Sequence, residues 1–170
     1  MEIETFWRWL ISRQARGRTG LSLLISRWIF VDAAVAVTAV LLLKVDGFQF
    51  ASKALFPAAS ILVSMSVAWT ARGSSVINDK KFRDKILNDD RPLEDYVYGY
   101  QLSLLVIMIT VVYISIMAVG GINVTFINEK TSILVSGFWL YFLLSMSVRS
   151  CWSVIDFSNM LGILNSRIDN

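Results

Sequence analysis

Histidine is absent from the 170 residues of this chain, and cysteine occurs only once. Without histidine the chain lacks the commonest general base, the commonest protein metal ligand and the usual pH switch. Cys151 alone cannot form an intrachain disulfide, a thiol redox pair or a cysteine-based metal site. Walker, glycine-rich phosphate-binding and serine-nucleophile motifs are also missing. The sequence therefore argues against an enzyme, and we expect no catalytic residue, no metal and no cofactor.

Charged residues are scarce as well, at 17% of the chain, whereas soluble domains carry about 25%. Hydrophobic residues make up 55%, and the mean hydropathy is +0.59. Four apolar windows, at 28–45, 54–71, 100–122 and 133–152, come close to the roughly 20 residues that a membrane-spanning helix needs. Little amphipathic sequence remains to cover four such helices in a soluble fold. We therefore expect an all-α polytopic membrane protein with four transmembrane helices.

The lysines and arginines are unevenly distributed around these windows. Of the 16, only Lys44, Lys53 and Lys130 flank the connections within the first and second pairs of windows. The others lie in the N-terminal segment, between the second and third windows, or at the end of the chain. Because cytoplasmic segments of membrane proteins carry the excess of these residues, both termini are predicted to be cytoplasmic. We expect an integral membrane protein.

The two connections predicted on the outer side, 46–53 and 122–132, are short, and short connections join antiparallel neighbours. We therefore expect two antiparallel hairpins, with the second helix continuing into the cytoplasm through 79–87. The predicted organisation is a basic, amphipathic N-terminal segment at 1–27, a hairpin at 28–71, a charged and partly helical cytoplasmic loop at 72–99, a second hairpin at 100–155 and a cytoplasmic tail at 156–170.

The tetrapeptide SMSV occurs twice, at 64–67 and at 145–148. Each copy falls in the inner half of the second helix of a predicted hairpin. An ancestral duplication of the hairpin explains this placement. Convergence explains it too, because helices that pack closely in lipid favour small residues at their contacts. The sequence leaves both explanations open.

Small residues recur at multiples of four positions along the second and fourth windows. The rows are Ser60, Ser64 and Ala68 on the second window, at intervals of four, and Gly137 and Ser145 on the fourth, eight residues apart. Such spacings place the members of each row on one helix face. We expect the first, second and fourth helices to pack through such faces and the third helix to be the more exposed to lipid.

Two ionisable residues fall inside predicted spans, Asp32 in the first and Arg149 in the fourth, at comparable depth from the inner side. Charged groups in a membrane are costly, and they usually pair or face water. We predict that Asp32 pairs with Arg149, or with Arg72, or that these residues line a polar vestibule. The alternative is that Arg149 extends to the lipid headgroups while Asp32 sits at the interface.

The N-terminal segment carries Arg8, Arg13, Arg16 and Arg18, which are candidates to bind an anionic ligand or lipid headgroups. The segment is predicted to form a short helix on the inner leaflet, with a disordered basic tail as the alternative. The 72–99 loop holds equal numbers of acidic and basic residues, so we expect no binding of duplex nucleic acid there.

In size, topology and lack of catalytic residues the chain resembles the small four-span membrane effectors of bacterial anti-phage defence and abortive infection. The resemblance implies a homo-oligomeric pore or channel-like protein that perturbs membrane permeability. It also implies a cytoplasmic trigger, either a protein or an anionic small molecule. The rival expectation is a non-conducting scaffold or accessory subunit of another membrane complex.

Overall fold

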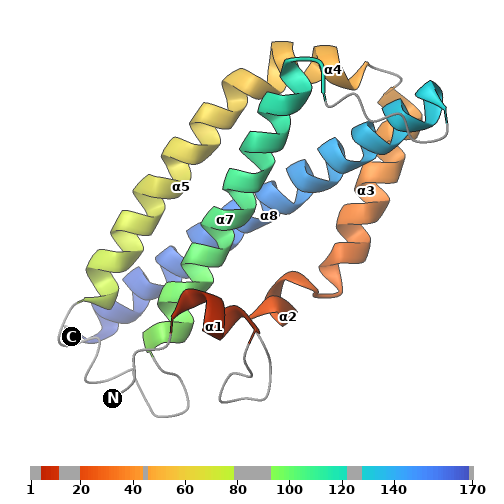
Figure 1. Ribbon diagram of the computed structural model, residues 1–170. Coiled ribbons are helices and arrows are strands. Elements are labelled where there is room, and N and C mark those ends of the chain that lie inside the picture. Colours follow the sequence, from red (N-terminus) through yellow and green to blue (C-terminus); the bar gives the residue numbers. More distant parts are fainter. Residues whose placement is uncertain (1–4, 12–19, 44–45, 79–92, 122–127, 169–170) are drawn as a thin grey trace.

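The computed structural model describes residues 5–11, 20–43, 46–78, 93–121 and 128–168. Within this part of the chain the regular secondary structure is helical, without a strand, as the all-α prediction required. The elements are α1 (Phe6–Ile11), α2 (Leu21–Leu24), α3 (Trp28–Leu43), α4 (Gly47–Phe50), the π-helix η1 (Ala51–Leu55), α5 (Phe56–Ile77), α7 (Leu93–Ala118) and α8 (Glu129–Ile168). Figure 1 shows a bundle of long helices, with α1 and α2 lying across one end and α4 across the other.

Three of the described helical stretches are long and apolar enough to cross a membrane. They are Gly47–Ser75, Val97–Ala118 and Lys130–Met160, which correspond to the second, third and fourth windows of the sequence. The first window forms α3, an apolar helix of 16 residues. At 1.5 Å per residue its length is about 24 Å, short of the roughly 30 Å of a bilayer hydrocarbon core.

The segment 46–53, expected to be a loop, is helical and runs directly into α5. The Asp46 carboxylate accepts a hydrogen bond of 3.0 Å from the Phe48 backbone N–H and so caps α4. Pro57 then lies inside a continuous helix, where it has no N–H to donate to the carbonyl four residues before it. The π-helix η1 ends two residues before Pro57, and its hydrogen bonds reach five residues back rather than four. The Phe56 N–H, for example, donates to the Ala51 carbonyl. The turn from α3 is therefore shorter than the sequence suggested.

Two glycines end α7. Gly120 and Gly121 have φ angles of 109° and 78°, in the left-handed region that favours glycine. The Gly121 N–H donates to the Ile116 carbonyl at 2.9 Å, and the Gly120 N–H donates to the Met117 carbonyl at 3.1 Å. These bonds satisfy carbonyls of the last turn in the manner of a Schellman motif and stop the helix at Ala118.

Helix α8 is the element on which the rest of the bundle is built. It packs against α3, α5 and α7, and its 40 residues continue through the segment that was expected to be a tail. The first predicted hairpin does not pack as one, because α3 lies against α8 rather than against α5 (Figure 1). The chain thus folds α3 back onto its last helix.

The expectation that the third helix faces lipid is wrong. Helix α7 contributes more to the buried core than the other long helices do, and it contacts α5, η1 and α8. Two hydroxyls connect it to α8. The Tyr113 hydroxyl donates to the Ser136 carbonyl at 3.0 Å, and the Thr110 hydroxyl shares its proton between the Val106 carbonyl of its own helix at 2.8 Å and the Leu143 carbonyl of α8 at 3.1 Å. Uniform apolarity had suggested lipid exposure, but in a membrane protein a buried helix and a lipid-facing helix have similar composition.

The row Ser60, Ser64 and Ala68 is not buried against the described part of the chain. All three residues are exposed on α5, and the hydroxyls of the two serines donate to backbone carbonyls of their own helix. The opposite side of α5 packs inward, through Ala59, Ser66 and Gly73 among others. These are also small residues, at a spacing of seven, so α5 carries small residues on two faces.

Candidate functional site

A charged side chain is buried where two apolar helices meet. Asp32 lies one turn into α3, in a stretch composed otherwise of alanine, valine, leucine and a threonine, and only 3% of it is exposed. It faces α8 together with Ala36, which is fully buried one turn further along. An isolated carboxylate in such a place would be strongly destabilising, so its surroundings must compensate for the charge.

That compensation comes from the second SMSV segment and the arginine that follows it. The Ser145 hydroxyl donates to Asp32 Oδ1 at 2.7 Å, and Arg149 Nη2 lies 2.8 Å from Asp32 Oδ2. Ser145 and Arg149 are four residues apart, so both side chains project from the same face of α8. Oδ1 therefore accepts a hydrogen bond, whereas Oδ2 has the arginine as an ion-pair partner without hydrogen-bond geometry. Of the two partners proposed from the sequence, the structure places Arg149 beside Asp32.

Ser26, which lies just before α3, completes the cluster. Arg149 Nη1 approaches the Ser26 hydroxyl at 3.4 Å, at the long end of the hydrogen-bonding range. The Arg149 side chain remains 28% exposed, whereas that of Asp32 is 4% exposed. The two charges therefore depend on the ion pair to different degrees. Arg149 can also interact with groups outside the protein, whereas Asp32 can interact only with groups of the protein.

The remainder of the α3–α8 contact is apolar and close. A Cβ atom placed on Gly137 would lie 3.8 Å from Val40 Cγ2, an ordinary van der Waals distance, so the two helices are in contact at this position. Asp32, Ala36 and Val40 follow one another at intervals of four along α3 and meet α8 in antiparallel order. We call this contact the α3–α8 seam. At Asp32 the seam is an ion pair, and at Val40 and Gly137 it is a close apolar contact.

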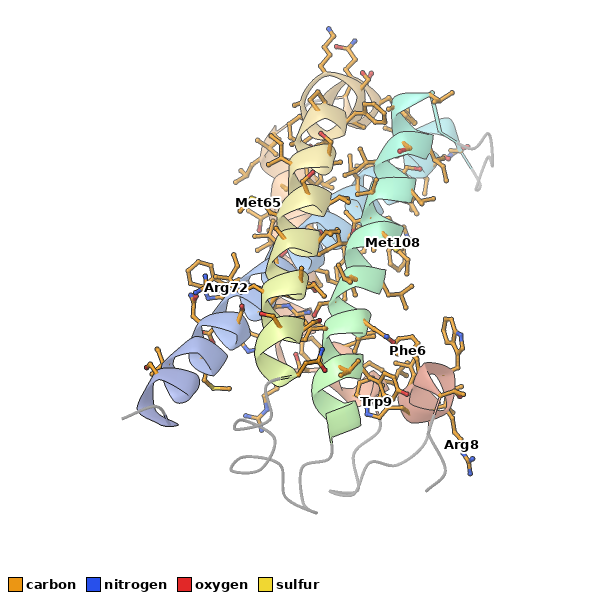
Figure 2. The ribbon with its side chains drawn as sticks, turned by 90° about the vertical axis from the view of Figure 1, so that its left-hand side faces the viewer. Phe6, Arg8, Trp9, Met65, Arg72 and Met108 are labelled. Atoms are coloured by element: carbon orange, nitrogen blue, oxygen red, sulfur yellow. The ribbon has the colours of Figure 1, made fainter. Side chains whose placement is uncertain are left out.

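The two SMSV copies have different surroundings. Ser145 of the second copy binds Asp32, whereas its counterpart Ser64 is exposed and donates to the Ser60 carbonyl. The arginines that follow differ too: Arg72 extends toward α8, with its guanidinium 4.0 Å from the position of a Gly162 Cβ (Figure 2). The shared feature is the other serine of each copy, Ser66 or Ser147, which is buried in both.

At the same end of the bundle, α1 packs against the start of α7. Trp9 and Leu10 are buried beside Leu102, and the rings of Trp9 and Tyr98 have centroids 5.5 Å apart. Arg8 is exposed on the other side of α1 (Figure 2). Arg13, Arg16 and Arg18 lie outside the described residues. The sequence had suggested a helix here but had not indicated that one of its faces would pack on protein.

Two further residues were not recognised as structurally important from the sequence. Nothing in the sequence indicated a role for Ser26, because it lies before the first apolar window. Gly73 accommodates the Tyr100 ring, whose hydroxyl and Cζ atoms would collide with any added Cβ. The spacing of Gly73 from Ser66 and Ala59 was visible and could have revealed the inward face of α5.

The described residues contain no group of three or more histidine, cysteine, aspartate or glutamate side chains arranged to hold a metal ion. Comparison of the chain with protein-family models, with curated proteins and with solved structures finds no match. The α3–α8 ion pair is therefore the candidate site, and its interpretation rests on its own geometry.

Proposed function

We propose that the chain is a four-span inner-membrane protein of bacteria, arranged N-in/C-in. In this proposal it assembles as a homo-oligomer and perturbs membrane permeability when a cytoplasmic signal reaches it, as a defence effector would. The alternative is a non-conducting scaffold or accessory subunit.

The four-span topology is supported by the arrangement of the helix ends. The start of α1, the end of α5, the start of α7 and the end of α8 lie at one end of the bundle, and α4 lies at the other (Figure 1). In the sequence, the stretches that connect α1 to α2 and α5 to α7 are rich in lysine and arginine, and the positive-inside rule assigns such stretches to the cytoplasm. Helix α3 would serve as the remaining span, since a short apolar helix is accommodated by local thinning of the bilayer.

The observation that carries the proposal is the Asp32–Arg149 pair. Ionisable residues inside membrane spans are rare and commonly mark ion pathways, relays or sensors. Here the pair lies in the seam between α3 and α8, and α3 has no other extensive contact with the long helices. Opening this seam would expose both charges to whatever enters it, whereas opening the α7–α8 contact would break neutral hydrogen bonds and expose no ion pair.

Conduction would require more than one copy. Within the chain, Ile107, Ile114 and Leu140 fill the middle of the bundle with almost no exposed surface, which leaves no room for a water-filled path among α5, α7 and α8. The exposed row of Ser60, Ser64 and Ala68 is suited to a second copy, because small residues allow close helix packing in lipid. The trigger would act at the end that carries α1, where Arg8 is exposed.

Flux and stoichiometry measured together test the proposal. We would reconstitute the protein in liposomes loaded with an ion-sensitive dye and count the copies per particle by single-molecule photobleaching. The proposal expects an oligomer with flux that is altered by Asp32→Arg or Arg149→Asp and restored when both changes are combined. A strictly monomeric protein without flux, at any voltage or with cytoplasmic extract added, contradicts it and supports the scaffold alternative.

Topology has an independent test. In a Cys151→Ser background, single cysteines would be placed at two exposed sites, Lys53 and Arg8, at opposite ends of the bundle. A thiol reagent that does not cross membranes should label Lys53→Cys in intact spheroplasts and Arg8→Cys only after lysis. Labelling of both sites, or of Arg8→Cys alone, would contradict the N-in arrangement.

A further inference from the structure

One side of α3 is covered by no other part of the described chain. Its side chains border a shallow, open space of about 610 Å³, which we call the α3 groove; among the α3 residues that line it, Thr38 is the only polar one. Phe30 and Leu42, near its two ends, are 75% and 74% exposed. This arrangement follows from the packing of α3, whose opposite side is the one that faces α8.

An arginine stands at one end of the groove. Arg27 is exposed, and its carbonyl accepts the Phe30 N–H, so it begins the first turn of α3. Arg27 directly precedes Trp28, the first residue of α3, and so lies at the Phe30–Val31 end of the groove. No described acidic residue pairs with Arg27, and Asp32 is already bound to Arg149.

The dimensions fit a lipid tail. The groove runs from Phe30 to Leu43, which is about 20 Å at 1.5 Å per residue. One leaflet of a bilayer contributes about half of the roughly 30 Å hydrocarbon core, so an acyl chain lies within that length. Trp28 is exposed beside Arg27, at the level where aromatic side chains meet headgroups.

We propose that the α3 groove binds one anionic phospholipid, with its phosphate at Arg27 and an acyl chain along Val31, Ala34 and Val35. The lipid then supplies the second neighbour that α3 lacks in the fold. This inference requires only that the protein resides in a membrane, and it stands whether or not the protein conducts ions.

Two variants separate the headgroup contact from the tail contact. Arg27→Gln removes the charge and leaves the groove open. Ala34→Phe fills the groove at an exposed position, so it is not expected to disturb the core. The matched controls are Lys53→Gln, an exposed cation at the far end of the bundle, and Val112→Phe, an exposed apolar position on α7.

Native mass spectrometry of the detergent-solubilised protein, titrated with phosphatidylglycerol or phosphatidylcholine, provides the measurement. We expect the wild-type protein to retain one phosphatidylglycerol more tightly than phosphatidylcholine. Arg27→Gln should weaken phosphatidylglycerol binding roughly fivefold, the effect of one basic residue at an anionic surface, and leave phosphatidylcholine unchanged. Ala34→Phe should weaken the binding of both lipids, and both controls should bind like the wild type.

Two results would overturn the inference. One is wild-type lipid affinity in both Arg27→Gln and Ala34→Phe. The other is a change in the number of protein copies in Ala34→Phe with lipid binding unaltered, which would assign the groove to a second copy of the chain. Far-UV circular dichroism on each variant establishes that it is folded, and Arg27→Gln, a surface change, tests the proposal even if Ala34→Phe does not fold.

Discussion

Removing either member of the Asp32–Arg149 pair should destabilise the protein, but by unequal amounts. Arg149→Ala leaves a carboxylate that is 4% exposed with only the Ser145 hydroxyl as a partner. Breaking a buried pair in this way costs about 3–5 kcal/mol. Asp32→Ala leaves an arginine that is 28% exposed and close to Ser26, and it can extend toward headgroups. We expect that change to cost about 1–3 kcal/mol, the range for a partly compensated polar group.

The double variant, in which both side chains are replaced by alanine, measures the coupling free energy between Asp32 and Arg149. With both side chains removed, no uncompensated charge remains, and the combined cost should be smaller than the sum of the single costs by about 2–3 kcal/mol. Asp32→Asn refines the comparison, because it removes the charge but keeps an oxygen for the Ser145 hydroxyl. SDS-induced unfolding in detergent micelles, followed by circular dichroism, measures the free energy of unfolding of the wild type and of these four variants on one scale.

The repeated tetrapeptide supplies a matched control for the hydrogen bond. Ser145→Ala removes the donor to Asp32 and should cost about 1 kcal/mol. Ser64→Ala, the same change at the equivalent position of the other copy, removes only a bond within α5 and should be close to neutral. If Asp32→Ala costs as much as Arg149→Ala, or if the single costs add in the double variant, the reasoning fails. Arg149 would then point to the lipid headgroups, as the sequence alternative held.

Four further substitutions test the other helices. Gly73→Ala should destabilise the α5–α7 contact by about 1–3 kcal/mol in the same unfolding assay, because the Tyr100 ring occupies the space of the new methyl group. Gly99→Ala, with open space around it, should be neutral or stabilising by up to about 1 kcal/mol. Tyr113→Phe should cost about 0.5–1.5 kcal/mol through loss of its hydrogen bond to α8. Ser64→Leu should lower the copy number counted by photobleaching without changing helix content, and an unchanged number would exclude this face from the assembly.

Much of the fold could be predicted because lipid imposes few solutions on an apolar chain. The positions of the second, third and fourth windows follow from length and hydropathy, and the structure has apolar helices of sufficient length there. The boundaries were less predictable. Residues 46–53 carry a lysine, a glutamine and an aspartate, which suggested a loop, yet the Asp46 cap and η1 make them helical. Polarity at the end of a membrane helix does not distinguish a helical turn from a loop.

Which helices touch was harder to predict than where they are. In water, the apolar face of a helix is the buried face, so periodicity identifies the contact. In a membrane, apolar side chains are equally suited to contact with protein and to contact with lipid. Only small or polar residues therefore indicate which face of a helix packs against another helix. On α5 small residues lie on two faces, and the sequence analysis chose Ser60, Ser64 and Ala68 rather than the inward row. On α8 the sequence analysis chose the face of Gly137 and Ser145, which meets α3, and it did not recognise a second face on which Ser147 and Ser158 are buried.

The Asp32–Arg149 contact was predictable for the opposite reason. A charge inside an apolar helix has few acceptable partners, and Arg149 is the arginine at matching depth on an inward face. The same reasoning explains why the two SMSV segments need not share a function. A serine within a membrane helix costs little free energy, because its hydroxyl can donate to a backbone carbonyl of its own helix, as the Ser64 hydroxyl does. It becomes an interhelical donor only where a neighbouring helix presents an acceptor, and α3 presents one to α8 alone. The difference between the copies therefore originates in Asp32 rather than in the repeated residues. A carboxylate introduced opposite Ser64, on a second copy or on a partner, would be the change needed to make the copies equivalent.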